Sequence, residues 1–349
     1  MDAEVGWLHA TPAAADADVL TREQVRSWRE RGFAFVSGVF DDALLARLCA
    51  DAAAAFPAAG TAAAAGLRDF GSGGRLAFPS ASEALNAVTL HPRLSTAVAR
   101  LLGVAVCELR LTQSDLWPKY GQALAPGALD NDDQRIHVDY PNHTLAHPAA
   151  WDRPEAVEAI LYLSDVDECG GATAVVAREG PSDPAYRWPI VDSPGIGELD
   201  WLNDRTHAEA YMARVRPDAA RWRAELYARE RRVRFARGDV LFYRHDLWHR
   251  GTPLRPGGLR LAQNLTFRKA SAEWIPVIHA GWAWSAYTPA KTLERLIARA
   301  SLDQRAVLGF PQPGSDYWGE ETIAAVEARY GAYGIDMRPY REALGGRAR

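Results

Sequence analysis

The sequence predicts an α+β fold, mainly β at its centre, in which helices flank an antiparallel barrel or jelly roll. From residue 106 to residue 269 the hydrophobic pattern mostly has a period of two, which is typical of strands. Gly, Pro and Asp turns separate these short apolar segments. No helical pattern follows each strand, as a parallel α/β sheet would require, so an antiparallel arrangement is favoured.

The N-terminal region predicts a helix, a strand and a second helix. In "LTREQVRSWRERG" Thr21 is a candidate N-cap with Gln24 three residues later, which forms a capping box, and Gly32 ends the helix. "FAFVSGVF" then has the composition of a strand. The next segment, "DDALLARLCADAAAAF", predicts a helix capped by Asp41 or Asp42.

The segment 57–78 is rich in Gly and Ala and predicts a surface loop. It has neither the preceding strand nor the Gly-Lys-Ser/Thr ending of a phosphate-binding loop. "LHPRLSTAVARLLG" predicts one more helix before the strands begin. The strand-like segments are 107–117, 135–140, 157–166, 172–177, 232–235, 240–244 and 259–269.

One long insert, at about 178–231, interrupts the strands and contains several prolines followed by a helical pattern. Long inserts of this kind are often functional, so we expect a lid-like element or a wall of a binding site. A helical extension is expected at about 286–345. Without repeats or a linker, residues 1–349 are interpreted as one domain with its core at about 20–270.

Composition excludes several classes of protein. The net charge of −4 gives no reason to expect nucleic-acid binding. The three cysteines lack a CxxC spacing, which argues against a disulfide scaffold or a zinc ribbon. The first residues have neither a basic start nor an apolar stretch, and no run of eighteen apolar residues occurs, so a cytoplasmic protein without a membrane anchor is expected.

Two polar residues in "RIHVDYPNH" are candidate metal ligands. His137 and Asp139 lie two residues apart on a predicted strand, so both side chains point to the same face. Alone, such a pair occurs by chance in many proteins and is more typical of a structural histidine. Downstream, "YRHDLWHRG" offers His245 and His249, and the residues themselves leave open which would join the pair.

An arginine on a later strand adds a candidate anion site. Arg260 lies eleven residues after His249 and shares a strand face with Ala262 and Asn264, whereas the opposite face is apolar and can pack on helices. Arg260 would therefore project into the barrel, where a buried cation needs an anion. Two histidines and a carboxylate form the facial triad of non-haem Fe(II) oxygenases, and a fixed Arg can bind the far carboxylate of 2-oxoglutarate.

Through most of residues 20–270 the chain resembles the phytanoyl-CoA dioxygenase family of Fe(II)- and 2-oxoglutarate-dependent oxygenases. "LTREQVRSWRERGFAFVSGVFDDALLARL" resembles the family's first helix, strand and helix, and "HVD" its HxD motif. "LYLSDVDECGGATAVV" is similar to the strand, turn and strand that follow, and "WHRGTPLRPGGLR" to the distal His and the 2-oxoglutarate Arg.

The resemblance implies a double-stranded β-helix core, the jelly roll of cupin-like enzymes. It favours His249 over His245 as the third ligand, so His137, Asp139 and His249 would bind Fe(II). Arg260 would bind 2-oxoglutarate, and O2 would complete the reactants.

Further contacts follow from the resemblance. In ectoine hydroxylase, a relative, a Gln on the strand before HxD contacts the co-substrate, and Gln113 is the matching position here. Relatives often carry a Ser two residues after the distal His; this chain has Gly251, so Thr252 is the candidate replacement. His143 and Asn264 are candidate substrate contacts.

The expected reaction is hydroxylation of a C–H bond in a small molecule, an intermediate of a natural product, with release of succinate and carbon dioxide. The family's halogenases carry a small residue where Asp139 stands, so halogenation is not expected. Desaturation, cyclisation or epimerisation at the same iron remain alternatives, as does a barrel that binds a metal or small ligand without turnover. The sequence indicates no oligomeric state.

Overall fold

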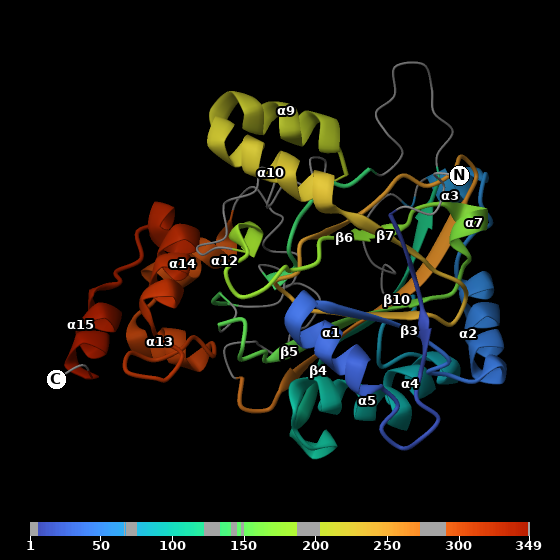
Figure 1. Cartoon of the computed structure of the whole chain (residues 1–349), viewed down its shortest axis with the longest axis horizontal. Helices are drawn as coiled ribbons and strands as arrows, with labels where there is room; N and C mark the ends of the chain where they lie inside the picture. The colour runs from blue at the N-terminus through green and yellow to red at the C-terminus, as the bar shows by residue number, and fades with distance from the viewer. Residues whose placement is uncertain are drawn as a thin grey trace.

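The computed structural model describes residues 6–65, 67, 75–121, 133–140, 145–147, 150–186, 203–272 and 291–347. Their strands form two sheets (Figure 1). The larger sheet has the order β2 (Thr11–Pro12), β3 (Phe33–Ser37), β8 (Val240–Tyr243), β5 (Ala156–Tyr162), β10 (Leu259–Lys269) and β4 (Leu109–Tyr120). The smaller sheet has the order β1 (Trp7–His9), β7 (Arg231–Arg234), β6 (Thr173–Val175) and β9 (His249–Gly251).

Mixed sheets with flanking helices confirm the predicted fold class. The central pairings are antiparallel, and only the N-terminal strands β1 and β2 pair in parallel, with β7 and β3. Within the described ranges the two sheets do not join into one closed barrel. The strands therefore form a sandwich of the jelly-roll kind rather than a closed barrel.

Helices cover one face of the larger sheet (Figure 1). Thr21 caps the first of them in a capping box with Gln24, and Asp41 rather than Asp42 caps the second, as its side chain accepts from the Leu44 N–H. Residues of these helices, apart from the short one at Ala62–Ala65, and of β3, β5, β8 and β10 form one hydrophobic core. The helices are α1 (Arg22–Arg31), α2 (Asp42–Ala55), α3 (Ala62–Ala65), α4 (Glu83–Thr89) and α5 (Pro92–Leu102), followed by the short η1 (Val106–Glu108).

The alternation on β10 agrees with the prediction. Leu265 and Phe267 belong to the core beneath the helices, whereas Ala262 belongs to a second core between the sheets. Because neighbouring side chains on a strand point to opposite faces, Arg260 lies on the inner side with Ala262. The same alternation on β5 places Glu158 on the inner side with Tyr162.

The segment 135–140 was predicted as a strand, and this prediction is wrong in extent. It forms a single bridge, His137 to His249, at the free edge of β9. The backbone N–H and carbonyl of the preceding residue, Ile136, bond to side chains of the insert instead of a neighbouring strand. At Ile136, hydrogen bonds to polar side chains thus take the place of the strand pairing that the two-residue periodicity predicts.

The insert contains η2 (Pro184–Tyr186) and a hairpin of α9 (Arg205–Val215) and α10 (Pro217–Arg229), which lies above β6 and β7 in Figure 1. Trp222 of α10 packs edge-on against Trp248, with ring centroids 5.2 Å apart. Trp248 immediately precedes His249, so its side chain points to the face of the smaller sheet opposite to the one that carries the His249 imidazole. The described helices of the insert therefore pack against the smaller sheet through Trp248. Residues 187–202 lie outside the described residues, and the lid-like element or wall of a binding site stays a prediction.

The C-terminal helices gather at one end of the molecule (Figure 1). The helical extension predicted at about 286–345 is confirmed within the described residues 291–347. Tyr317 donates to the His147 carbonyl at 2.6 Å, and Tyr330 donates to that of Leu145, so this extension holds the chain shortly after the HxD motif. The elements are α12 (Thr292–Arg299), α13 (Leu302–Val307), α14 (Glu320–Tyr330), η4 (Gly331–Tyr333) and α15 (Arg338–Arg347).

The short α7 (Val166–Cys169) connects β5 to β6. In the part of the chain described here, no helix has the length and apolar character needed to cross a membrane.

Candidate active site

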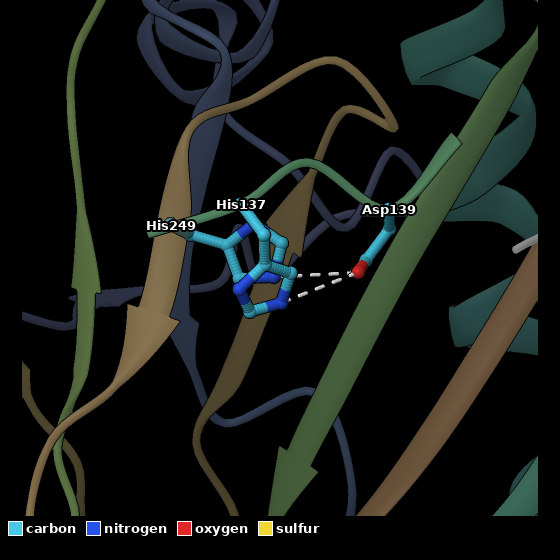
Figure 2. A group of neighbouring side chains, drawn as sticks. All are labelled: His137, Asp139 and His249. Carbon is cyan, nitrogen blue, oxygen red and sulfur yellow. Dashed lines mark ion pairs between the residues drawn. The ribbon is translucent and has the colours of Figure 1, made fainter. Parts of the chain in front are cut away.

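His137, Asp139 and His249 come together between the sheets, and their candidate ligand atoms all lie within 4.8 Å of one another. His137 Nε2 is 3.6 Å from Asp139 Oδ1, and His249 Nε2 is 3.3 Å from Asp139 Oδ2 (Figure 2). The two imidazole centroids are 4.5 Å apart. Two imidazole nitrogens and one carboxylate that converge in this way can bind one divalent metal ion on a single face.

Backbone bonds hold both imidazoles. His137 and His249 exchange two N–H···O bonds of 2.9 Å each, which places their side chains next to each other. His137 Nδ1 lies 2.9 Å from the Arg135 carbonyl, and His249 Nδ1 lies 3.0 Å from that of Leu247. A carbonyl only accepts, so each Nδ1 carries the hydrogen and each Nε2 lone pair is available for a metal.

The electrostatics favour a metal over protons at this site. Burial, with the neighbouring His249, lowers the pKa of His137 to about 3. Burial also acts to lower the pKa of His249, but the Asp139 carboxylate and the hydrogen bond to the Leu247 carbonyl together outweigh it, and the pKa is raised. Since a metal ligand must be a neutral imidazole, the lowered pKa of His137 favours metal binding, whereas the raised pKa of His249 makes protons compete with the metal at that ligand.

Tyr243, which is not among the candidate residues of the sequence analysis, also belongs to this site. Its hydroxyl donates to Asp139 Oδ2 at 2.7 Å, and its ring lies 4.9 Å from that of His249. Burial and the nearby Asp139 charge raise its pKa well above the usual value, so the phenol stays protonated and remains a donor. The alternation along "VLFYR" could have indicated it, because Leu241 and Tyr243 share the inner face.

A second buried carboxyl group, Glu158 of β5, lies beside this group. Its Oε2 accepts from Thr266 Oγ1 at 2.5 Å, and its Oε1 is 3.4 Å from His245 Nε2. Burial, with the Asp139 charge, raises the pKa of Glu158 well above its usual value. His245, the rival ligand, thus contacts Glu158 while His249 joins the metal-binding group.

Arg260 is a buried cation whose carboxylate partner is missing among the described residues. Its Nη1 donates to the Gly171 carbonyl at 2.6 Å, and its buried Nε has no hydrogen-bond partner there. Its positive charge acts to lower the pKa of the buried Tyr162, which desolvation nevertheless raises to about 12. A buried guanidinium without a carboxylate fits the far end of a dicarboxylate such as 2-oxoglutarate.

The remaining candidates are placed as follows. Gln113 of β4 lies 3.3 Å from Thr266 Oγ1, near Glu158 rather than beside Arg260. The Thr252 hydroxyl donates to the Ala172 carbonyl at 2.9 Å, so its hydrogen is already engaged. Asn264 is half-buried on the face of β10 that carries Arg260, and His143 lies outside the described residues.

Two histidines, one carboxylate and a buried arginine between the sheets of a jelly roll define the class of non-haem iron oxygenase sites. The chain belongs to the phytanoyl-CoA dioxygenase family, whose model matches residues 28–262. No curated protein sequence matches the chain. Family and donor set together support iron, 2-oxoglutarate and oxygen as the reactants at this site.

Solved structures are similar to this chain at low identity. SnoK, a non-haem α-ketoglutarate-dependent carbocyclase from nogalamycin biosynthesis, is 20% identical with a TM-score of 0.50, over 76% of this chain and 90% of SnoK. The epimerase SnoN, solved with Fe3+, α-ketoglutarate and nogalamycin RO, is 18% identical with a TM-score of 0.48, over 74% and 88%. EvdO2 from Micromonospora carbonacea var. aurantiaca, solved with 2-oxoglutarate, is 15% identical with a TM-score of 0.48, over 75% and 96%. The likeness to SnoK supports the jelly-roll fold.

Proposed function

We propose that this protein is an Fe(II)- and 2-oxoglutarate-dependent dioxygenase that hydroxylates a C–H bond of a small molecule, an intermediate of natural-product synthesis. The proposal is supported by the convergence of His137, Asp139 and His249, together with Arg260 on the inner side of β10, a buried cation without a carboxylate among the described residues. A barrel that only binds a metal would have no need of that arginine.

The residues of the chain have separate tasks in this proposal. His137, Asp139 and His249 would hold the iron, which when bound supplies oxygen activation coupled to decarboxylation of 2-oxoglutarate to succinate. Arg260 would orient 2-oxoglutarate by binding the carboxylate at the far end of that molecule, and Gln113 would make a further contact with it. Tyr243 fixes the Asp139 carboxylate through the 2.7 Å hydrogen bond.

The natural-product part of the proposal is supported by the named roles of SnoK and SnoN, both of which belong to nogalamycin biosynthesis. Those two are a carbocyclase and an epimerase, so ring closure and epimerisation are the second candidate outcomes. The outcomes differ in product mass, because hydroxylation adds one oxygen atom, ring closure or desaturation removes two hydrogens, and epimerisation leaves the mass unchanged.

The test is succinate formation from 2-oxoglutarate with Fe(II) and oxygen, across a panel of small-molecule candidates. We expect slow succinate formation without substrate and faster formation with a productive one, and mass spectrometry of that product assigns the reaction. Protein that binds Fe(II) but never forms succinate with any candidate would refute the enzyme proposal and favour a binding role.

A further inference from the structure

The backbone of Ile136, the residue before the ligand His137, is held by two side chains of α10. Arg223 Nη2 donates to the Ile136 carbonyl at 2.9 Å, and the Ile136 N–H donates to the Tyr227 hydroxyl at 2.9 Å. In a sheet these two groups would bond to a neighbouring strand. Here the side chains of Arg223 and Tyr227 complete the backbone hydrogen bonds of Ile136, the residue before the proposed ligand His137.

Glu209 of α9 joins both side chains to each other. Its carboxylate accepts from Arg223 Nε at 3.0 and 2.9 Å, and from the Tyr227 hydroxyl at 2.7 Å. The Arg223 side chain is only 1% exposed, and a buried guanidinium needs such a partner. A hydroxyl can accept one bond and donate another, so Tyr227 links Ile136 to Glu209 directly. We call Glu209, Arg223 and Tyr227 the hairpin clamp.

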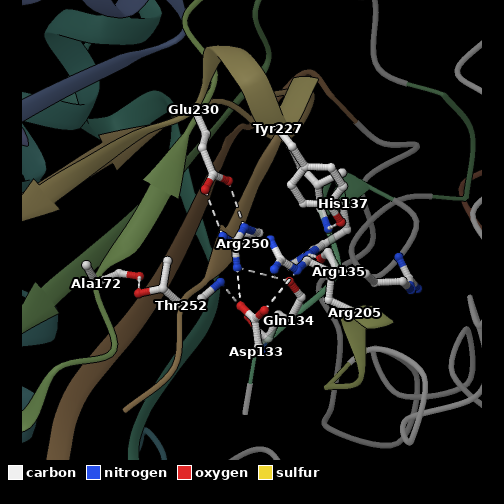
Figure 3. A network of polar contacts seen from close by, with 12 residues as sticks. Asp133, Gln134, Arg135, His137, Ala172, Arg205, Tyr227, Glu230, Arg250 and Thr252 are labelled. Atoms are coloured by element: carbon white, nitrogen blue, oxygen red, sulfur yellow. Dashed lines mark hydrogen bonds and ion pairs between the residues drawn. The ribbon is translucent and has the colours of Figure 1, made fainter. Parts of the chain in front are cut away.

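Strand β9, which carries the ligand His249, is held by the same helical hairpin and by Glu230, the residue after α10. Arg250, next to His249, makes two bonds of 2.7 Å to Glu230, the residue after α10, and also pairs with Asp133 (Figure 3). Its guanidinium lies 5.5 Å from the centre of the Tyr227 ring. Asp133 in turn pairs with Arg205 of α9 at 2.9 Å. Charged groups at the start of α9 and just after α10 therefore reach Arg250, the neighbour of His249, either directly or through Asp133.

These contacts fall on the residues that alternate with the ligands. Ile136 precedes His137, and Arg250 follows His249, so each of these contacts lies one peptide bond from an imidazole ligand. A displacement of Ile136 would carry His137 Nε2 with it, because the two residues share one peptide bond. Groups that orient metal ligands in this indirect way tune metal affinity.

Resting on the proposed metal site, we infer that the hairpin clamp positions His137 against His249 for metal binding, with Tyr227 and Arg223 as positioning residues. The insert is then part of the metal site's support rather than a lid. The alternative is that the clamp only stabilises the fold. That alternative predicts a lower unfolding temperature with an unchanged metal site.

The experiment compares Tyr227→Phe and Arg223→Gln with Arg221→Gln in the full chain. Arg221 lies on the same helix, and its ion pair with Asp218 is solvent-exposed, which makes it a matched control. Metal-free protein is titrated with Co(II), a divalent ion of the same ligand preference, and the visible absorption spectrum and the Kd are recorded beside thermal unfolding.

We expect Tyr227→Phe to weaken Co(II) binding by about tenfold or more and to change the spectrum, since loss of a group that orients a ligand typically costs 10- to 100-fold. Arg223→Gln should weaken it at least as much, and Arg221→Gln should match the wild type. If Tyr227→Phe has the wild-type Kd and spectrum, the inference is wrong, whatever the unfolding temperature of that variant. This result refutes the inference even if Arg223→Gln does not fold. Wild-type protein that binds no Co(II) overturns the proposed metal site instead.

Discussion

Replacing Arg260 by alanine should raise the KM for 2-oxoglutarate steeply and leave iron binding nearly intact. Arg260 is 9% exposed, and its one hydrogen bond among the described residues goes to the Gly171 carbonyl. It makes no ion pair or hydrogen bond with the three proposed iron ligands there. The variant would thus remove the partner of the co-substrate's far carboxylate without disturbing the metal site.

The magnitude follows from the burial of this cation. Removing one partner of a buried charged pair typically costs about 3–5 kcal/mol. At 1.4 kcal/mol for each factor of ten, the expected loss of affinity ranges from about 10²-fold to about 4 × 10³-fold. Arg260→Lys should recover only part of this loss, because an ammonium group cannot make the two-pronged contact of a guanidinium with a carboxylate.

The assay is succinate formation at varied 2-oxoglutarate concentration, with iron content measured by mass spectrometry. Arg255→Ala is the control, since Arg255 is an exposed arginine in the turn before β10. Arg268→Ala tests the other inner-face arginine of the strand. An unchanged KM in Arg260→Ala, together with a raised KM in either of the other variants, would refute the assignment.

Three further outcomes are expected. His249→Ala should abolish iron binding, whereas His245→Ala should largely retain it; metal analysis showing an equal or greater loss at His245 would mean that the third ligand is misassigned. Tyr243→Phe removes the 2.7 Å hydrogen bond to the carboxylate ligand and should weaken Fe(II) binding by about tenfold or more, which anaerobic titration measures; an unchanged Kd would contradict this role. Gly121→Ala should lower the unfolding temperature in a thermal melt, because a Cβ there would lie 1.8 Å from the Arg255 carbonyl oxygen, and an unchanged melt would show that the turn relaxes freely.

The local elements could be predicted from the sequence because their causes are local. The capping box of Thr21 and Gln24 and the alternation along β10 depend on residues a few positions apart, and both are confirmed. The segment around His137 was mistaken for a longer strand because the hydrogen-bond partners of the Ile136 backbone come from a distant insert, which no short sequence window contains.

The sequence by itself determined that the chain carries two candidate ligands two residues apart, an arginine eleven residues after a histidine, and the motifs of a known family. The family resemblance favoured His249 over His245, and the structure confirms that His249 lies beside His137. Tertiary structure alone decided that Tyr243 contacts Asp139 and that α10 of the insert packs against Trp248, the neighbour of His249. The reason is physical: these contacts join segments far apart in the chain, and their geometry depends on how the two sheets pack, which residue spacing does not encode.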